Sequence, residues 1–243
     1  MNISIITITK NAEKEIERTL FSVAQQTFPV EYIVVDGASE DGTAAIVERY
    51  RHTVSRFISE PDSGIYHAMN KGIRAAAGDY CLFLNAGDYL AYPAAIANAV
   101  AAMSETEPAD VFYGCQLMIH QRNGASHIWR PRKKGTLDFF SGSLPHASSF
   151  ICRKAFDRIG LYDESFRIAG DYEWFVRAFT RGIRFIALSC LVAVFLQDEG
   201  ISTHPKQKEL QKLEMQRVRE LYFHGFKRTT LQVGLFLRKN KIL

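Results

Sequence analysis

Two short apolar runs in this chain end in acidic, glycine-containing turns. Residues 33–43 read IVVDGASEDGT, and residues 81–88 read CLFLNAGD. This pattern is typical of buried parallel strands that deliver polar groups to the carboxyl edge of a sheet. Open α/β sheets bind ligands at that edge. We therefore expect Asp36 and Asp88 to form one site, with one carboxylate binding a nucleotide and the other a divalent metal ion.

The elements that position these turns alternate through the first half of the chain. Strand-like and helical patterns follow one another from Ile3 to about Tyr113, which predicts right-handed crossovers and a mostly parallel sheet with helices on both faces. The expected strands are 3–9, 32–35, 56–59, 80–84 and 111–113, and the expected helices are 14–26, 42–50, 65–76 and 93–104.

The second half has a different pattern. The Asn-Gly turn in residues 121–124 predicts a hairpin of strands 117–120 and 127–129. Further along, the spacing of apolar residues predicts strands, a helix that stops at Gly182, and a charged C-terminal helix. The expected strands are 148–152 and 188–196, and the expected helices are 171–181 and 205–223.

Bulk composition limits the functional classes. The 243 residues, 47% of them hydrophobic, suffice for one domain with a C-terminal extension. The net charge of +4 is concentrated in residues 130–134 and 206–241, which favours an anionic partner such as phosphate or membrane headgroups. We expect no nucleic-acid partner, because neither a recognition helix nor a ribonucleoprotein motif is present.

The four cysteines are widely spaced and form no C-x-x-C pair, so we read them as free thiols in a reducing compartment. The first residues enter a strand directly, and no window reaches about 18 uninterrupted apolar residues. These features predict a cytoplasmic protein that does not span the membrane.

Several motifs, taken together and in order, resemble the family-2 glycosyltransferases. These are inverting enzymes of the GT-A fold, and the chain is most similar to the bacterial type that assembles polysaccharides, such as colanic acid transferases. The resemblance covers about three quarters of the chain, from Ile3 to near Phe179. The residues that carry it are 4–11 (SIITITKN), 36–43 (DGASEDGT), 59–66 (SEPDSGIY), 68–73 (AMNKGI), 78–80 (GDY), 83–88 (FLNAGD) and 170–174 (GDYEW).

The resemblance implies a fold and an activity. The fold is α/β: a GT-A-like layer sandwich with a small antiparallel region on the acceptor side. Residues 1–113 would bind the nucleotide-sugar, residues 114–200 would bind the acceptor and supply the catalytic base, and residues 201–243 would form a helical extension. The implied activity is Mn²⁺- or Mg²⁺-dependent transfer from a UDP-sugar to a saccharide or lipid-linked saccharide.

The resemblance also assigns the nucleotide-binding residues. Thr9 and Asp36 would contact the uracil, with Ser39 nearby, and a carboxylate is a strong acceptor for the imide N–H of uracil. The alternative for this turn is that Ser39 and Asp41 merely cap the helix that follows. Asp62, Asn70 and Lys71 would lie near the nucleotide, although a solvated helix face explains Lys71 equally well.

Asn85 and Asp88 occupy the place of the family's D-x-D-like metal motif. A hard divalent cation takes oxygen ligands and would neutralise charge on the departing diphosphate, so we expect Asp88 to bind the metal. Asn85 stands where many members have an acidic residue, and it would serve the ribose or act through water. The alternative is a surface turn stabilised by Gly87 and Asp88. His204 is a second candidate metal ligand, or part of a hinge.

Asp171 is the expected catalytic base, since inversion needs a group that takes the proton of the acceptor hydroxyl. At a helix start its carboxylate would be ionised at neutral pH; the alternative is a plain N-cap. Glu173 is the back-up base, although helical spacing turns it away from Asp171. His146 would lie on the acceptor or diphosphate side, or be structural.

The C-terminal stretch 226–243 mixes apolar and basic residues in the manner of an interfacial helix. It predicts peripheral attachment to the inner face of the cell membrane, and a homodimer helix is the competing account. A sugar-phosphate nucleotidyltransferase would need a Gly-rich basic loop after the first strand, which residues 9–13 lack. A dehydrogenase would need G-x-G-x-x-G there. A non-catalytic sugar-nucleotide-binding domain stays open, supported by Asn85.

Overall fold

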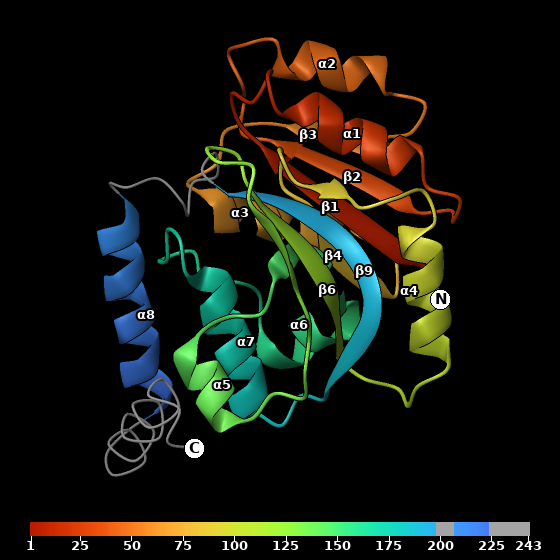
Figure 1. Cartoon of the computed structure of the whole chain (residues 1–243). Coiled ribbons are helices and arrows are strands. Elements are labelled where there is room, and N and C mark those ends of the chain that lie inside the picture. Colours follow the sequence, from red (N-terminus) through yellow and green to blue (C-terminus); the bar gives the residue numbers. More distant parts are fainter. Residues whose placement is uncertain (198–206, 224–243) are drawn as a thin grey trace.

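The computed structural model describes residues 1–197 and 207–223 and shows one central sheet covered by helices on both faces (Figure 1). The strands are β1 (Ile3–Thr9), β2 (Glu31–Asp36), β3 (Arg56–Ser59), β4 (Tyr80–Phe83), β5 (Tyr89–Leu90), β6 (Val111–His120), β7 (Ser126–Trp129), β8 (Ser149–Cys152) and β9 (Phe185–Gln197). The helices are α1 (Ile16–Ala24), α2 (Thr43–Arg49), α3 (Ile65–Ala75), α4 (Ala95–Ser104), α5 (Thr136–Ser141), α6 (Arg153–Ile159), α7 (Gly170–Thr180) and α8 (Lys208–Tyr222), and η1 (His146–Ser148) is a single 3₁₀ turn.

The sheet is mostly parallel, as expected. Its order is β3-β2-β1-β4-β8-β6-β9-β5, with β7 paired to the outside of β6. The four strands from β3 to β4 run parallel to one another, and β6 runs parallel to β9. Strands β5, β7 and β8 pair in the antiparallel sense. The parallel strands therefore end together at one edge, where the acidic turns lie.

Each face of the sheet has its own core. Ile3 and Ile5 of β1 pack in the core under α1, α2 and α4, whereas Ile6 and Ile8 pack in the core under α3, α6 and α7. β1 is buried on both faces, which explains its almost continuous apolar sequence. The helix α8 packs against α7 and adds the buried side chain of Val218 to the second core (Figure 1).

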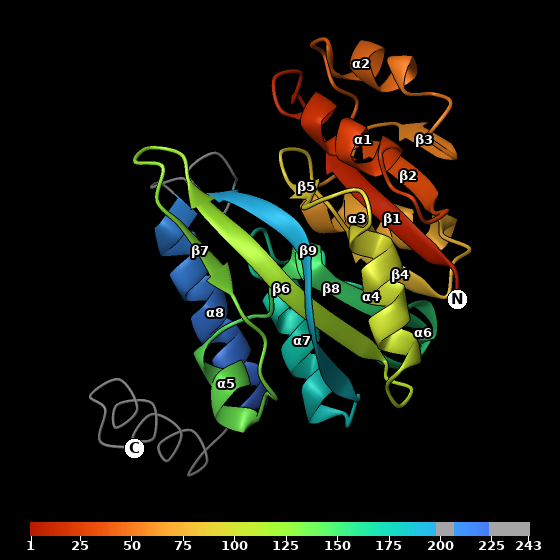
Figure 2. The same cartoon turned by 45° about the vertical axis from the view of Figure 1, so that its right-hand side comes forward.

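One sheet runs through both halves of the chain, because β8 joins β4 to β6. Figure 2 shows β6 and β9 as long strands that lie side by side and extend to the β7 hairpin. The expected hairpin around residues 121–124 is confirmed. Its first strand, however, continues from residues 111–113, so the two strands expected over 111–113 and 117–120 are one strand. A Cβ at Gly114 would lie 2.6 Å from the Val192 side chain, so glycine lets β9 approach the continuous strand.

The other expected strands and helices are confirmed, with ends that differ by no more than three residues. The sequence analysis missed β5, α5 and α6, which are short. No helix of the described residues is long and apolar enough to cross a membrane. The stretch 226–243 and His204 lie outside the described residues.

Candidate active site

The carboxyl edge of the sheet brings together polar residues from three neighbouring strands. Thr9 of β1 is the register partner of Asp36 of β2, and the Gly37 N–H donates to the Thr9 carbonyl over 2.9 Å. Asn85 follows β4, the strand on the other side of β1. The structure therefore places the three residues expected at the nucleotide along one edge.

Two buried polar atoms at this edge lack a partner. Within the described part of the chain, Thr9 Oγ1 and Asn85 Oδ1 are inaccessible to solvent and make no hydrogen bond. Leaving a buried donor or acceptor unsatisfied costs about 1–3 kcal/mol, so such atoms are rare. Their position on adjacent strand ends is typical of an edge that binds a polar ligand.

Asp36 is fully buried, and serine side chains hold its carboxylate in place. The carboxylate accepts the Ser39 N–H over 3.0 Å, the Ser59 hydroxyl over 2.7 Å and the Ser39 hydroxyl. Ser39 therefore supports Asp36 and does not cap α2. Asp41 takes the capping role, because its carboxylate accepts the Thr43 N–H over 3.0 Å. A carboxylate has about four lone-pair sites, so Asp36 retains capacity for one more donor.

Asp62 lies against the same turn. Its carboxylate accepts the Gly64 N–H over 3.0 Å. The other carboxylate oxygen covers Gly37 so closely that a Cβ at this position would lie 2.2 Å from it. The loop before α3 thus adds a second carboxylate next to Asp36.

Asn70 and Lys71 have partners within the protein. The buried Asn70 amide donates to the Tyr162 carbonyl over 3.0 Å and to the Glu164 carboxylate over 2.8 Å, and it accepts the Tyr162 N–H over 3.0 Å. Lys71 Nζ donates to the Pro61 carbonyl over 2.8 Å and pairs with Glu60 at 2.9 Å. In this arrangement Asn70 ties α3 to Tyr162, and Lys71 holds the loop that carries Asp62.

Asp88 lies in the turn between β4 and β5, and α1 supports this turn. The Thr19 hydroxyl donates to the Asp88 carbonyl over 2.7 Å and accepts the Gly87 N–H over 3.0 Å. Burial raises the pKa of the Asp88 carboxyl to about 8, and the positive charge of Arg18 offsets part of this effect. A carboxyl in such surroundings needs a nearby cation to stay ionised.

The residues of this turn fit a hard divalent cation that takes its remaining ligands from a diphosphate and water. Asp88 supplies a carboxylate, and Asn85 Oδ1 is an acceptor that has no partner among residues 1–197 and 207–223. No group of three or more His, Cys, Asp or Glu side chains is gathered for a metal among the residues described. Mg²⁺ is commonly held by one or two carboxylates plus substrate phosphates, so this small donor set is compatible with it.

Asp171 is the second residue of α7, and Ala169 occupies the N-cap position. The Tyr66 hydroxyl lies 3.4 Å from the Asp171 carboxylate and donates to the Ile168 carbonyl over 2.7 Å. Burial raises the pKa of Asp171 to about 6, opposed by the Tyr172 N–H and the hydroxyls of Tyr66 and Ser143. A general base works best when its pKa lies near the working pH, so this carboxylate is suited to accept a proton.

The Ser143 hydroxyl is a third buried polar group that makes no hydrogen bond within the described residues. This hydroxyl acts against the effect of burial by lowering the pKa of the Asp171 carboxyl. The sequence analysis missed Ser143 and Tyr66. Tyr66 is the last residue of the SEPDSGIY motif, so the sequence could have indicated it as a site residue. Ser143 lies in a loop without a recognisable pattern.

His146 packs in an aromatic cluster with Phe83, Tyr162 and Phe175. Its ring stacks on Phe83 with centroids 4.8 Å apart, and its Nε2 shares a 2.8 Å hydrogen bond with the Tyr162 hydroxyl. Burial lowers the pKa of His146 to about 3, so the imidazole is neutral at physiological pH. Tyr162 in turn packs against Tyr66, with ring centroids 5.7 Å apart. His146 thus contributes packing and a hydrogen bond but no positive charge.

Glu173 has no free carboxylate to serve as a base. Arg177 pairs with it at 3.0 Å, and the Tyr222 hydroxyl donates to it over 2.5 Å. The side chain is buried between α7 and α8. The back-up assignment for Glu173 therefore does not match the geometry, since this residue links two helices.

The family profile described as "Glycosyl transferase family 2" matches residues 4–160. An "uncharacterized glycosyltransferase" of Mycobacterium tuberculosis is 32% identical over 206 residues, which cover 83% of this chain and 77% of the relative. A "PGL/p-HBAD biosynthesis glycosyltransferase" of Mycobacterium bovis is 29% identical over 218 residues, covering 86% of this chain and 82% of the relative.

Solved structures show the same fold. S. aureus TarS in complex with UDP-GlcNAc superposes with a TM-score of 0.68 at 25% identity, covering 82% of this chain and 60% of the TarS chain. The mannosyltransferase PcManGT from Pyrobaculum calidifontis, in complex with GDP-Man and Mn²⁺, has a TM-score of 0.66 at 20% identity over 90% of this chain. The chain spans less than two thirds of either structure's length, 60% and 64% respectively.

Proposed function

The chain belongs to glycosyl transferase family 2, and we propose that it transfers a sugar from a UDP-sugar to a saccharide acceptor with inversion at the anomeric carbon. The observation that carries this proposal is the pairing of two features. Unpartnered polar atoms lie at the carboxyl edge of the sheet, and the separate carboxyl group of Asp171 has a pKa of about 6.

The donor site is formed by the ends of β1, β2 and β4. Asp36 accepts the uracil N–H, Thr9 Oγ1 offers a buried hydroxyl beside it, and Ser39 keeps the carboxylate oriented. Asp62 covers the same turn. The TarS complex with UDP-GlcNAc, a structure of the same fold, supports uridine as the nucleoside.

Asp88 and Asn85 would hold Mn²⁺ or Mg²⁺. When bound, the cation neutralises charge on the diphosphate leaving group. The PcManGT complex with Mn²⁺ supports a divalent ion in this fold, and the buried Asp88 carboxyl favours a cation nearby. Thr19 of α1 fixes the backbone of the turn that carries both residues.

Asp171 acts as the general base. Its carboxylate takes the proton of the acceptor hydroxyl while that oxygen bonds to the anomeric carbon, and the bond from this carbon to the nucleoside diphosphate breaks on the opposite face. Proton removal by a positioned side chain contributes about 10²–10⁴-fold to such a rate. The Tyr66 hydroxyl, 3.4 Å from the carboxylate, limits its orientations.

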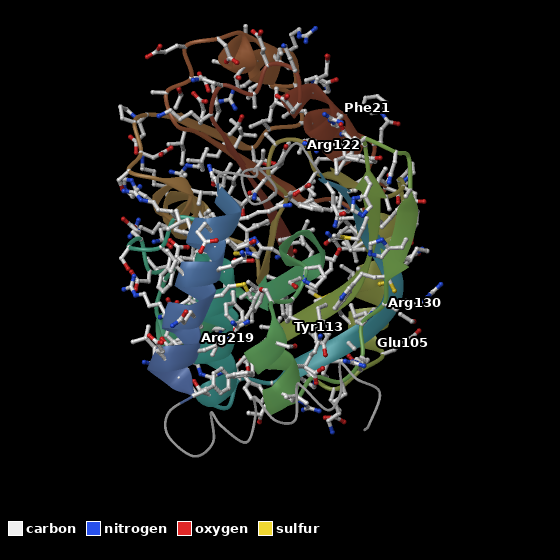
Figure 3. The ribbon with its side chains drawn as sticks, turned by 60° about the vertical axis from the view of Figure 1, so that its left-hand side comes forward. Phe21, Glu105, Tyr113, Arg122, Arg130 and Arg219 are labelled. Carbon is white, nitrogen blue, oxygen red and sulfur yellow. The ribbon has the colours of Figure 1, made fainter. Side chains whose placement is uncertain are left out.

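The acceptor is a lipid-linked saccharide that carries phosphate. Basic side chains in and just after the β6–β7 hairpin are exposed to solvent, among them Arg122 and Arg130 (Figure 3). Lys133 is also exposed. Together with the basic and apolar stretch 226–243, these residues support peripheral attachment to the inner face of the membrane, and homodimer formation remains the rival role for that stretch.

A transfer assay tests the proposal. Purified protein, Mn²⁺ and a panel of UDP-sugars with lipid-linked saccharides should give UDP release together with glycosylated product. Asp171→Asn should lower turnover at least about 100-fold, because it removes the general base. Asp157→Asn removes an exposed carboxylate from α6 and should leave turnover unchanged. Full activity of Asp171→Asn would overturn the base assignment, and UDP binding without product for any donor would indicate a binding domain.

A further inference from the structure

The helix α8 buries a carboxylate next to the segment that leads to the catalytic base. Glu214 is 7% exposed, although most of α8 is highly charged. Its carboxylate accepts three consecutive backbone N–H groups: Arg167 over 2.7 Å, Ile168 over 2.9 Å and Ala169 over 2.8 Å. Burial of a carboxylate is costly unless such donors compensate it, so this geometry holds both partners firmly.

These three residues immediately precede the first turn of α7, and Asp171 follows Ala169 by two residues. The unpaired N–H groups at a helix start carry partial positive charge, which favours an anion there. Glu214 thus anchors the N-terminus of α7 from a different helix. The family profile ends at residue 160, before both α7 and α8.

The same segment also orients the tyrosine beside the base. The Ile168 carbonyl accepts the Tyr66 hydroxyl over 2.7 Å, and this hydroxyl lies 3.4 Å from Asp171 Oδ1. Gly170 packs flat against the Tyr66 ring, since a Cβ there would lie 2.7 Å from a ring carbon. A shift of residues 167–169 would therefore move both Tyr66 and Asp171.

Other contacts hold α8 in place without touching this segment. Tyr222 donates to Glu173 over 2.5 Å, and Arg219 Nε donates to the Phe140 carbonyl over 2.9 Å, reaching from α8 toward α5 (Figure 3). The docking of α8 can therefore be weakened separately from the contact of Glu214 with the backbone.

We propose that Glu214 is a positioning residue for the glycosyl transfer: through it, α8 fixes the backbone of residues 167–169 and thereby the orientation and shielding of Asp171. The inference rests on the proposed function in that Asp171 is taken as the base. A purely structural role for Glu214 would affect the fraction of folded protein but would leave the properties of Asp171 in the folded fraction unchanged.

The variant Glu214→Gln separates the two roles. Glutamine keeps the side-chain length but presents an NH₂ group where one carboxylate oxygen accepted backbone N–H groups. We expect kcat to fall about 10–100-fold, the loss that a displacement of about 1 Å can cause, with KM for the UDP-sugar within about twofold of wild type. Water that reaches Asp171 should also shift the acid limb of the pH profile to lower pH.

Two matched variants serve as controls. Tyr222→Phe weakens the docking of α8 at its other end, and Glu209→Gln removes an exposed carboxylate that pairs with Lys212 in α8. Both should keep the wild-type kcat and pH profile. If Glu214→Gln does not fold, Glu214→Asp keeps the charge but is one methylene shorter, and it should show the same changes to a smaller extent.

A titration of the Asp171 carboxyl by ¹³C NMR, assigned through Asp171→Asn, reads the positioning without any substrate. A lower pKa of Asp171 in Glu214→Asp, which keeps the negative charge that by itself raises the pKa of a neighbouring carboxyl, supports the inference even if the transfer assay fails with every donor. An unchanged Asp171 pKa, together with a kcat loss no greater than that of Tyr222→Phe, would overturn it. The two proposals can therefore fail independently.

Discussion

At the scale of single residues, burial tunes three titratable side chains in different ways. It raises the pKa of Asp171 to about 6 and that of Asp88 to about 8, and it lowers the pKa of His146 to about 3. The raised value suits Asp171 to a proton transfer near neutral pH, and the neutral His146 can pack against Phe83 without a counter-ion. Burial away from water is therefore the largest cause of the pKa shift at each of these three side chains.

The pH dependence of transfer follows from Asp171. Protonation of its carboxyl removes the base, so kcat/KM should fall by about tenfold per pH unit below pH 6, the pKa of this group. Steady-state rates between pH 4.5 and 8, measured at saturating metal, check this expectation. A flat profile down to pH 5 would show that another group accepts the proton.

The same burial should cost stability above pH 6. The pKa of Asp171 is raised from 3.8 to about 6, so the unfolded state binds fewer protons between these values and wild-type stability falls as pH rises through them. The full shift corresponds to about 3 kcal/mol, which solvent near the side chain reduces to about 1–2 kcal/mol. Asp171→Asn should therefore raise the melting temperature by about 2–6 °C at pH 8. The gain should vanish below pH 4, and a destabilised variant at pH 8 would contradict it.

The residues at strand ends were predictable from sequence, and those that support them were not. Asp36, Asn85 and Asp88 terminate apolar runs, so their place at the sheet edge follows from pattern alone. Asn70 and Lys71 lie next to one another in a motif, but only the fold shows that their partners are Tyr162 and Pro61. Glu214 lies in a helix full of charges, where no local signal marks one carboxylate as buried.

At the scale of elements, helices position the functional turns through single hydrogen-bonding side chains. Thr19 of α1 holds the Asp88 turn, and Glu214 of α8 holds the start of α7. The helices themselves were predictable because their apolar residues recur with helical spacing. The elements β5 and α5 were missed because 2 and 6 residues are too few to show a period. The helix α6 has 7 residues, as α2 has, but it begins directly after β8, without the acidic, glycine-containing turn that precedes α2.

The support that α1 gives to the metal turn is testable with Thr19→Val. The variant leaves the Gly87 N–H without its partner and loses the bond to the Asp88 carbonyl. We expect a loss of about 1–3 kcal/mol in the free energy of unfolding and a weaker metal-dependent thermal shift with UDP. Thr27→Val, which changes an exposed threonine just after α1, should behave as wild type. If Thr19→Val shows the same metal-dependent thermal shift with UDP as wild type, α1 does not support the metal-binding turn.

The packing of α7 on α3 is testable with Gly170→Ala. The added Cβ would lie 2.7 Å from the Tyr66 ring, which must move away from Asp171. We expect about 1–3 kcal/mol of destabilisation and a lower kcat, measured by denaturant unfolding and by the transfer assay. Gly135→Ala is the matched control, because its Cβ would meet no atom closer than 4.0 Å. Wild-type kcat in Gly170→Ala would show that the position of Tyr66 is unimportant.

At the scale of the whole molecule, one sheet joins the proposed donor side to the proposed acceptor side. The parallel strands β3, β2, β1 and β4 form the edge that we propose binds the nucleotide, and β8 joins them to β6, which forms the hairpin with β7. The base enters from α7, on the face that also holds α3. The donor residues and the base therefore belong to different elements, and a change at one end should leave binding at the other intact.

The separation of the two ends is best tested by calorimetric titration of UDP with Mn²⁺ into wild type, Asp36→Asn and Asp171→Asn. The account predicts that wild type and Asp171→Asn bind UDP with similar affinity. Asp36→Asn should bind at least about tenfold more weakly, because a charged hydrogen bond to the uracil is worth about 1.5–3 kcal/mol. Absence of UDP binding by wild type, or equal binding by Asp36→Asn, would contradict the central claim that this sheet edge is the donor site.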